Sequence, residues 1–222
     1  MSQDTHYKLQ DIINQDILEL LKDYGVGWNS PYDIIAEFER RLAKYTGAPY
    51  VVTTDCCTHA LELCFRIKRV KRVKFTSYTY LSIPMLMHKL GIKYELVPEN
   101  WTGEYRFYGT DIWDSARRVE RNMYREGQMQ CLSFGYGKPL HIGHGGAILL
   151  DDKLAYETLL CMRYDGRDLS ISPWETQKIF AVGYHYRPTI EDAECGLNLL
   201  NHVDEKPKYV NYPDLRAIKI VG

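Results

Sequence analysis

A lysine surrounded by small residues is the feature of this sequence best suited to chemistry. The run SFGYGKPLHIGHGG, from Ser133 to Gly146, places Lys138 between an upstream hydroxyl and downstream glycines. Few side chains can screen such an amine, so a flat molecule could approach it closely. A lysine with a depressed pKa has a partly neutral amine that can form an imine. The alternative is a solvated loop lysine, the commonest fate of this residue.

A carboxylate at the end of an apolar run is the second candidate. Asp114 closes the segment GTDIWD, which has the pattern of a short strand. Ligands of parallel α/β sheets bind beyond the carboxyl ends of the strands. A carboxylate there could pair with a cation such as a protonated ring nitrogen. The alternative is a helix cap, or a salt bridge with Arg117 or Arg118.

The turn in TTDCCTHAL is a candidate anion site. A helix that opens at Thr58 directly after a strand presents free backbone N–H groups and the positive end of its dipole, which suits a phosphate. Every strand-to-helix turn offers this, so a plain helix cap is the alternative.

Strands and helices alternate along the sequence. Helical spacing of apolar residues predicts helices over 8–24, about 31–45, 58–68, 80–90, 153–163 and 189–202, with Ser30 as N-cap of the second and Gly47 at its end. Short β-branched or apolar runs predict strands at 50–55, within 73–80, and at 93–98, 109–114 and 146–150. This alternation predicts an α/β fold with a mostly parallel sheet.

Composition excludes several classes of protein. The chain has 222 residues, 45% hydrophobic and 26% charged, which fits one large soluble domain with a real core. A net charge of −1 gives no reason to expect nucleic-acid or membrane partners. The six cysteines show no framework spacing, so we expect reduced thiols in a cytoplasmic protein. No run is apolar enough to span a membrane, and the N-terminus is too polar for a signal peptide. His141, His144 and His185 match no zinc pattern, and we expect no metal site.

Taken together, six segments in order between about residues 25 and 201 resemble the DegT/DnrJ/EryC1/StrS family of sugar aminotransferases. The segments are GVGWNSPYDIIAEFERRLAKYTGAPYVV, TSYTYLS, DIWDSAR, SFGYGKPLHIGHGG, CMRYDGRD and VGYHYRPTIEDAECGLNLL. Residues 133–146 meet the family pattern SFxxxKxLxxGxGG at every fixed position. The resemblance implies pyridoxal 5'-phosphate as cofactor. It also implies a fold-type-I, aspartate aminotransferase-like large domain with helices on both faces of the sheet.

The resemblance implies roles for the cofactor-ring residues. Lys138 would form an imine with the cofactor and later move the proton between substrate and cofactor carbons. Asp114 would keep the pyridine nitrogen protonated. Tyr80 would stack on the ring, and Arg117 stands where a neutral residue usually approaches the ring hydroxyl.

The resemblance also implies a phosphate site. Thr58, with the backbone of Cys57, would bind the phosphate at the helix start, and Ser133 would add a hydroxyl. His185 stands where the family has an asparagine that reaches the phosphate of the neighbouring subunit. This implies a homodimer with shared active sites.

Several departures from the family pattern bear on function. Cys57 replaces a glycine of the phosphate turn, and Arg117 brings a charge where a neutral group is usual. The resemblance implies that the region between Trp101 and Asp114 is compressed and that we should expect the C-terminal small domain to be largely missing. We therefore expect an N-terminal helix and turn (1–30), a cofactor-binding α/β domain (31–201) and a short C-terminal tail (202–222) that lies over another part of the molecule.

These observations lead to one leading hypothesis and one rival. The leading hypothesis is an aminotransferase that moves an amino group from an amino acid, glutamate, to a nucleotide-linked keto-deoxysugar. A related sugar 3-dehydratase would carry histidine in place of Lys138. The rival is a non-catalytic or regulatory remnant that kept the cofactor fold without the substrate-closing domain.

Overall fold

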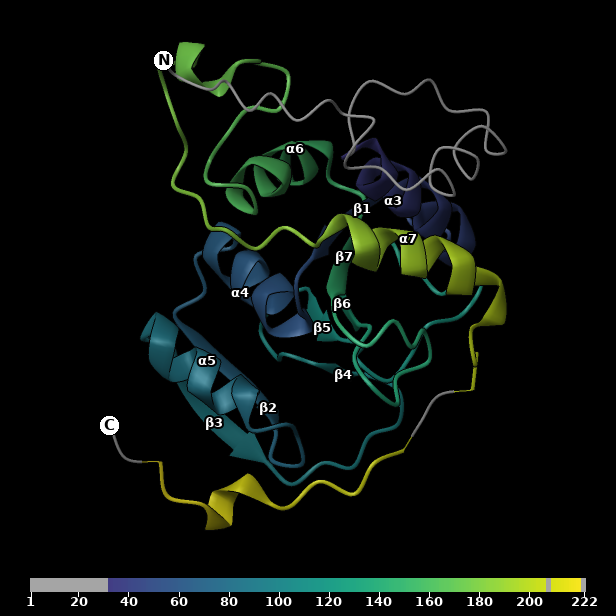
Figure 1. Ribbon diagram of the computed structural model, residues 1–222. Helices are drawn as coiled ribbons and strands as arrows, with labels where there is room; N and C mark the ends of the chain where they lie inside the picture. The colour runs from purple at the N-terminus through teal and green to yellow at the C-terminus, as the bar shows by residue number, and fades with distance from the viewer. Residues whose placement is uncertain (1–31, 207–208, 221–222) are drawn as a thin grey trace, which may run out of the picture.

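The computed structural model describes residues 32–206 and 209–220 (Figure 1). The helices described are α3 (Asp33–Thr46), α4 (Cys57–Ile67), α5 (Ser82–Leu90), α6 (Lys153–Met162) and α7 (Ile190–Leu199). The strands are β1 (Tyr50–Thr54), β2 (Arg72–Thr76), β3 (Lys93–Val97), β4 (Tyr105–Arg106), β5 (Ile112–Asp114), β6 (Met129–Ser133) and β7 (Gly146–Leu150). Short 3-10 helices lie at Trp174–Thr176, Leu200–His202 and Leu215–Ala217.

The predicted elements that fall within the described residues are confirmed, with ends shifted by up to three residues. Gly47 ends α3 as expected, with a φ of 76° that glycine adopts without a Cβ penalty. The predicted helix over 8–24 and the predicted N-cap Ser30 lie outside the described residues. Strands β4 and β6 were not predicted.

The main sheet is mixed, so the prediction of a mostly parallel sheet is wrong. Its five strands follow the order β1-β7-β6-β5-β4, and only β5 and β6 pair in parallel. A parallel pair needs a long crossover, usually a helix. Residues 107–111 and 134–145 contain no helix, and the strands that they join run antiparallel. Strands β2 and β3 form a separate parallel pair, which a bridge between Lys74 and Tyr108 links to the segment after β4.

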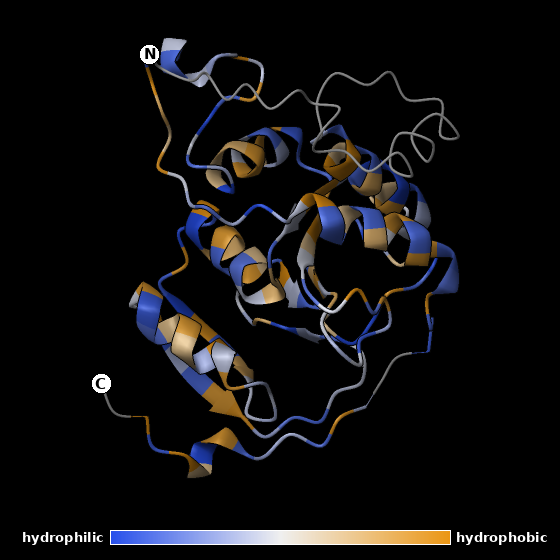
Figure 2. Ribbon diagram, in the orientation of Figure 1, coloured by the Kyte–Doolittle hydropathy of each residue, from blue (hydrophilic) through white to orange (hydrophobic). Residues whose placement is uncertain are grey.

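Helices cover both faces of the main sheet, as expected. Alternate residues of β1 face opposite ways, with Val52 in the core beneath α4, α5 and α6 and Val51 in the core beneath α3 and α7. Residues of β7 alternate in the same way. Ile148 and Leu150 lie in the core with Val52, and Ala147 and Leu149 lie in the core with Val51. Figure 2 shows hydrophobic and hydrophilic residues on different faces of these helices.

A close contact between helices explains one motif glycine. A Cβ added to Gly196 of α7 would lie 2.5 Å from the Phe38 ring of α3. Only glycine lets the two helices approach so closely, which brings the first and last helices described onto the same face of the sheet. Within residues 32–206 and 209–220, every helix is too short or too polar to cross a lipid bilayer.

Candidate cofactor site

A cavity of about 420 Å³ brings together most of the residues singled out in the sequence. It lies where β5 and β6 end and where α4 and α5 begin. Seven candidates line it: Cys57, Thr58, Tyr80, Asp114, Arg117, Ser133 and Lys138. Its volume is that of a typical small-molecule site.

Lys138 lies in the loop between β6 and β7. The loop is held by backbone hydrogen bonds from Gly143 to Phe134 (2.8 Å) and from Lys138 to Gly135 (3.2 Å). Gly137 has a φ of 68°, which turns the chain just before the lysine. Burial lowers the pKa of Lys138, and the positive charge of Arg117 lowers it further. More of this amine is therefore neutral at a given pH than in a solvated lysine.

Asp114 is buried at the end of β5, with an exposed fraction of 5%. Its Oδ2 accepts a hydrogen bond from the Tyr105 hydroxyl at 2.8 Å, and its Oδ1 accepts one from the Ala116 amide at 3.0 Å. The Tyr105 hydroxyl also lies 2.8 Å from the Thr79 hydroxyl. Burial raises the pKa of Asp114, although these hydrogen bonds and Lys138 oppose it. Such a carboxylate gains from a cationic partner, and among the described residues each of its oxygens accepts one hydrogen bond and can accept another.

The turn before α4 is shaped by a glycine. A Cβ on Gly146 would lie 2.5 Å from the Cys57 nitrogen and 2.7 Å from the Cys56 carbonyl carbon. Glycine thus lets β7 pack directly against the turn that starts α4. Among the described residues, no side chain caps this helix start, so its first N–H groups remain available to an anion.

The hydroxyls and the thiol around this turn have defined positions. The Thr58 hydroxyl lies 2.9 Å from that of Ser82, and both residues line the cavity. The Cys57 sulfur lies 3.7 Å from the Cys131 carbonyl, so its thiol is directed toward the core. Burial and the charge of Asp114 raise the pKa of Cys57, which keeps the thiol neutral. Cys57, which stands where the family has a glycine, thus adds no negative charge beside the candidate phosphate site.

An ion pair flanks the same turn. His59 Nδ1 lies 2.7 Å from Asp55 Oδ1, and the His59 ring stacks on Tyr186 with centroids 3.7 Å apart. Burial lowers the pKa of His59, but hydrogen bonds to Asp55 and Cys56 outweigh it and raise the pKa to about 9. Asp55, Cys56 and His59 also bring three potential metal ligands within 4.8 Å of one another. This grouping was not predicted from the sequence, and the ion pair between Asp55 and His59 accounts for two of its three members.

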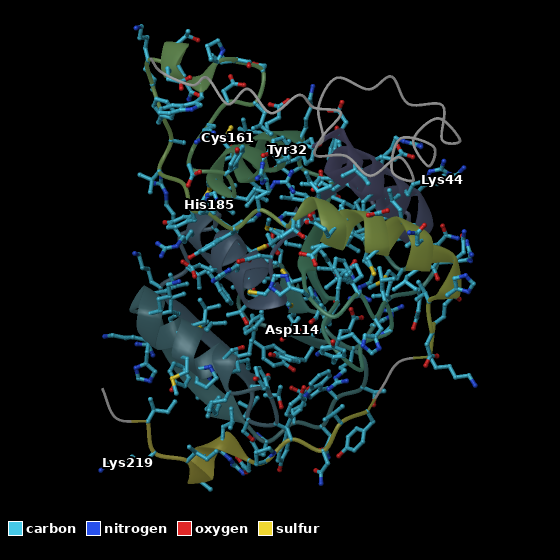
Figure 3. The ribbon with its side chains drawn as sticks, viewed as in Figure 1. Tyr32, Lys44, Asp114, Cys161, His185 and Lys219 are labelled. Carbon is cyan, nitrogen blue, oxygen red and sulfur yellow. The ribbon has the colours of Figure 1, made fainter. Side chains whose placement is uncertain are left out.

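His185 is the one predicted site residue outside the cavity. It is exposed, with 74% of its side chain accessible, and its Nδ1 lies 3.0 Å from Asp165 Oδ2. Figure 3 shows His185 well apart from Asp114. Its role toward a neighbouring subunit stays a prediction.

Three aromatic residues that line the cavity were not predicted from the sequence to be site residues: Trp101, Tyr136 and Tyr212. Tyr105, which holds Asp114, and Ser82, which contacts Thr58, were also missed. Trp101 and Tyr105 lie in the compressed segment before Asp114, and Tyr212 lies in the tail. Neither segment has a periodicity that would have singled out a residue.

Solved structures show where this fold occurs elsewhere. AtS13 from Actinomadura melliaura superposes with a TM-score of 0.69 at 22% identity, over 86% of this chain and 65% of that one. The sugar aminotransferase CalS13 from Micromonospora echinospora gives 0.67 at 20% identity, over 92% and 67%. DesI, solved in the presence of its TDP-sugar product, gives 0.62 at 18% identity, over 84% and 57%. This chain therefore spans about two thirds of the length of such proteins or less. These neighbours establish a fold-type-I aminotransferase fold.

Sequence comparison identifies the family directly. A search of curated protein sequences gave no significant match. The model of the DegT/DnrJ/EryC1/StrS aminotransferase family, however, matches residues 10–97 and 116–209. Asp114 falls in the gap between these matches, and it is the fold that brings it beside Lys138 in one cavity. The chain belongs to the DegT/DnrJ/EryC1/StrS aminotransferase family.

Proposed function

We propose that this protein is a pyridoxal phosphate-dependent aminotransferase. In this proposal it takes the amino group of an amino acid, glutamate, and delivers it to a keto group on a nucleotide-linked keto-deoxysugar. The observation that carries the proposal is the convergence of Lys138, Asp114 and the start of α4 on one cavity. Family membership supports the same reaction class.

The donor set of the cavity fits the cofactor. An amine of lowered pKa suits an aldehyde, and a buried carboxylate with an unfilled lone pair suits a protonated pyridine nitrogen. An uncapped helix start suits a phosphate. Lys138, Asp114 and the start of α4 thus match the aldehyde, the ring nitrogen and the phosphate of pyridoxal phosphate.

Lys138 would carry both the covalent and the proton-transfer roles. When bound, the cofactor supplies an electron sink that stabilises negative charge on the substrate α-carbon. Lys138 Nζ would hold the cofactor covalently until the donor amine displaces it. The freed Nζ of Lys138 would then act as the general base that takes the α-proton of the donor, and afterwards as the general acid that gives that proton back.

Asp114 and its hydrogen-bond partners would maintain the electron sink. The Asp114 carboxylate would keep a proton on the ring nitrogen. The Tyr105 hydroxyl and the Ala116 amide orient that carboxylate. Tyr80, exposed at the start of α5, would cover one face of the ring.

The start of α4 would hold the phosphate. The first N–H groups of the helix, the Thr58 hydroxyl and the Ser133 hydroxyl would donate to its oxygens. Protonated His59 would lie beside this site with its charge balanced by the Asp55 carboxylate.

We extend the proposal to partners and organisation. His185 would reach the phosphate of a neighbouring chain in a homodimer, which its exposure permits. Residues 31–201 would form the cofactor-binding domain, with 1–30 as an N-terminal helix and turn, 202–222 as a tail, and a cytoplasmic location. CalS13 is named a sugar aminotransferase and DesI was solved with a TDP-sugar, which favours a nucleotide-linked acceptor.

A half-reaction tests the proposal. The purified protein, loaded with pyridoxal phosphate, is mixed with glutamate while its absorption spectrum is recorded. We expect loss of the lysine-bound cofactor band and formation of pyridoxamine phosphate, and a panel of nucleotide-linked keto-sugars should then restore the band. Lys138→Ala should show neither change. A cofactor band that no amino acid alters would favour the non-catalytic alternative.

A further inference from the structure

A strap formed by residues 209–220 lies against the cofactor-site half of the molecule. It includes the short helix at Leu215–Ala217 and passes beside β2, β3 and α5 (Figure 1, yellow). Residues beyond 209 are not matched by the family model. The strap is therefore a feature of this chain that family membership does not explain.

The strap has a defined seat. The Leu215 amide donates to the Ser77 carbonyl at 3.0 Å, and the Leu215 side chain is buried, with an exposed fraction of 6%. Leu215 and Ile218 line a cavity with Leu81 and Pro84 of the α5 region. Apolar contact and a backbone hydrogen bond together fix this part of the strap beside the residues that precede α5.

Tyr212 projects from the strap into the cofactor cavity. Its ring stacks on Trp101, with centroids 6.1 Å apart and an interplanar angle of 13°. Trp101 is itself held by a 2.6 Å hydrogen bond from its indole nitrogen to the Tyr78 carbonyl. Both stacked residues come from segments that the family model leaves unmatched.

The Tyr212 hydroxyl contacts a cation of the cavity. It accepts a hydrogen bond from Arg117 Nη2 at 3.5 Å, while Arg117 Nη1 donates to the Gly137 carbonyl at 2.9 Å. Arg117 Nε is buried and has no hydrogen-bond partner among the described residues. A guanidinium with an unused buried donor can bind an oxygen anion, because each N–H that stays unpaired costs free energy.

We propose that the strap closes one side of the cofactor cavity and that Tyr212 is a positioning residue, which aims the Arg117 guanidinium at an oxygen anion bound there. The inference rests on the proposed function, since the anion is either the ring oxygen of the cofactor or the carboxylate of the amino-acid donor. Stacking on Trp101 fixes the Tyr212 ring, and the hydroxyl restrains Arg117.

Tyr212→Phe tests the positioning role, with Tyr209→Phe in the same strap as the matched control. Removing the hydroxyl while keeping the stack should weaken anion binding about fivefold, the effect of one hydrogen bond of about 1 kcal/mol. A weaker affinity for pyridoxal phosphate with an altered pH dependence of its absorption would identify the ring oxygen. A raised KM for glutamate with kcat nearly unchanged would identify the donor carboxylate. Equal behaviour of Tyr212→Phe and Tyr209→Phe in both measurements would overturn the positioning role.

Hydrogen exchange tests the strap without the cofactor. We expect slow exchange of the strap amides near Leu215 in the cofactor-free protein, and loss of that protection in Leu215→Asp with the far-ultraviolet circular dichroism unchanged. Exchange of the wild-type strap at the rate of an unstructured peptide would overturn the closure proposal. Failure of the proposed function is separate, because it would appear as wild-type protein that forms no lysine-bound cofactor band.

Discussion

The pKa of Lys138 is set by its burial and by two charged residues, Arg117 and Asp114, that lie well before it in the sequence. Burial and the Arg117 charge lower the pKa of its amine, while Asp114 opposes that shift. The glycines around Lys138 made it a candidate, but they could not show that Asp114 lines the same cavity. Individual residues of the site could therefore be predicted from the sequence. Their effects on one another's pKa values could not.

The effect of Arg117 on Lys138 can be measured by substitution. Arg117→Gln removes a positive charge, so the pKa of Lys138 should rise and less of its amine should be neutral at pH 7. We expect slower reaction with added pyridoxal phosphate, with the pH midpoint of the rate shifted upward. The rate of growth of the cofactor band, followed as a function of pH, measures this shift. An unchanged pH profile would contradict the account.

The ion pair beside the phosphate turn predicts a pH-dependent stability. The pKa of His59 is raised from 6.5 to about 9 in the folded state. Its contribution is therefore fully present below about pH 6.5 and is lost as the pH rises through about 9. Because solvent screens this partly exposed pair, the free energy of unfolding should fall by about 1 kcal/mol over this window. In His59→Gln this part of the fall should be absent when urea denaturation is followed at each pH. An identical pH dependence in both proteins would refute the assignment.

At the scale of elements, sequence patterns located strands better than they oriented them. β-branched and apolar runs marked β1, β3 and β7, but the pattern does not specify the direction of the partner strand. The loop of residues 134–145 contains no helix, and the two strands that it joins, β6 and β7, run antiparallel. Strand β4 has two residues and gives no periodic signal at all.

The buried ion pair between Arg163 and Glu39 could not be predicted from sequence patterns. Arg163, from the segment CMRYDGRD, donates to Glu39 and to the Thr53 carbonyl, and both charged side chains are buried. The pair joins α3 to β1 and the end of α6. The sequence marked this arginine only through a family motif, and its structural role depends on three elements that meet in the fold.

Any side chain at position 146 should lower the free energy of unfolding, because it would collide with the turn before α4. In Gly146→Ala the Cβ would lie 2.5 Å from the Cys57 nitrogen, so the turn and the start of α4 must move. We expect a loss of about 3 kcal/mol in the free energy of unfolding and weaker phosphate binding, measured by urea denaturation and by titration with inorganic phosphate.

Gly135→Ala is the matched control for stability. Its added Cβ would meet nothing nearer than the Ser133 hydroxyl oxygen at 3.9 Å. Equal stability losses in the two variants would show that the close approach at Gly146 is unimportant.

At the scale of the whole molecule, segments that lie far apart in the sequence meet at one cavity. The described chain brings seven of the eight candidate residues to one cavity and leaves His185 exposed elsewhere. Composition and motifs could predict the fold class. They could not predict that residues 209–220 return to the cavity, because contacts between distant segments leave no periodic trace in a sequence.

Mixed dimers test the proposed sharing of sites. His185→Ala and Lys138→Ala should each have low activity, for different reasons. Mixing the two variants should produce dimers in which one site keeps both residues intact, so activity should rise above that of either variant. Light scattering should show dimers throughout. A strict monomer, or no gain on mixing chains that do exchange, would contradict a role for His185 in a neighbouring site.

The central claim is that Lys138 forms the covalent link to the cofactor. Borohydride reduction of the pyridoxal phosphate-loaded protein, followed by protease digestion and mass spectrometry, locates that link directly. We predict one modified residue, Lys138, in the peptide between β6 and β7, and no modification there in Lys138→Ala. A cofactor fixed to another lysine, or none fixed to wild-type protein, would contradict the account.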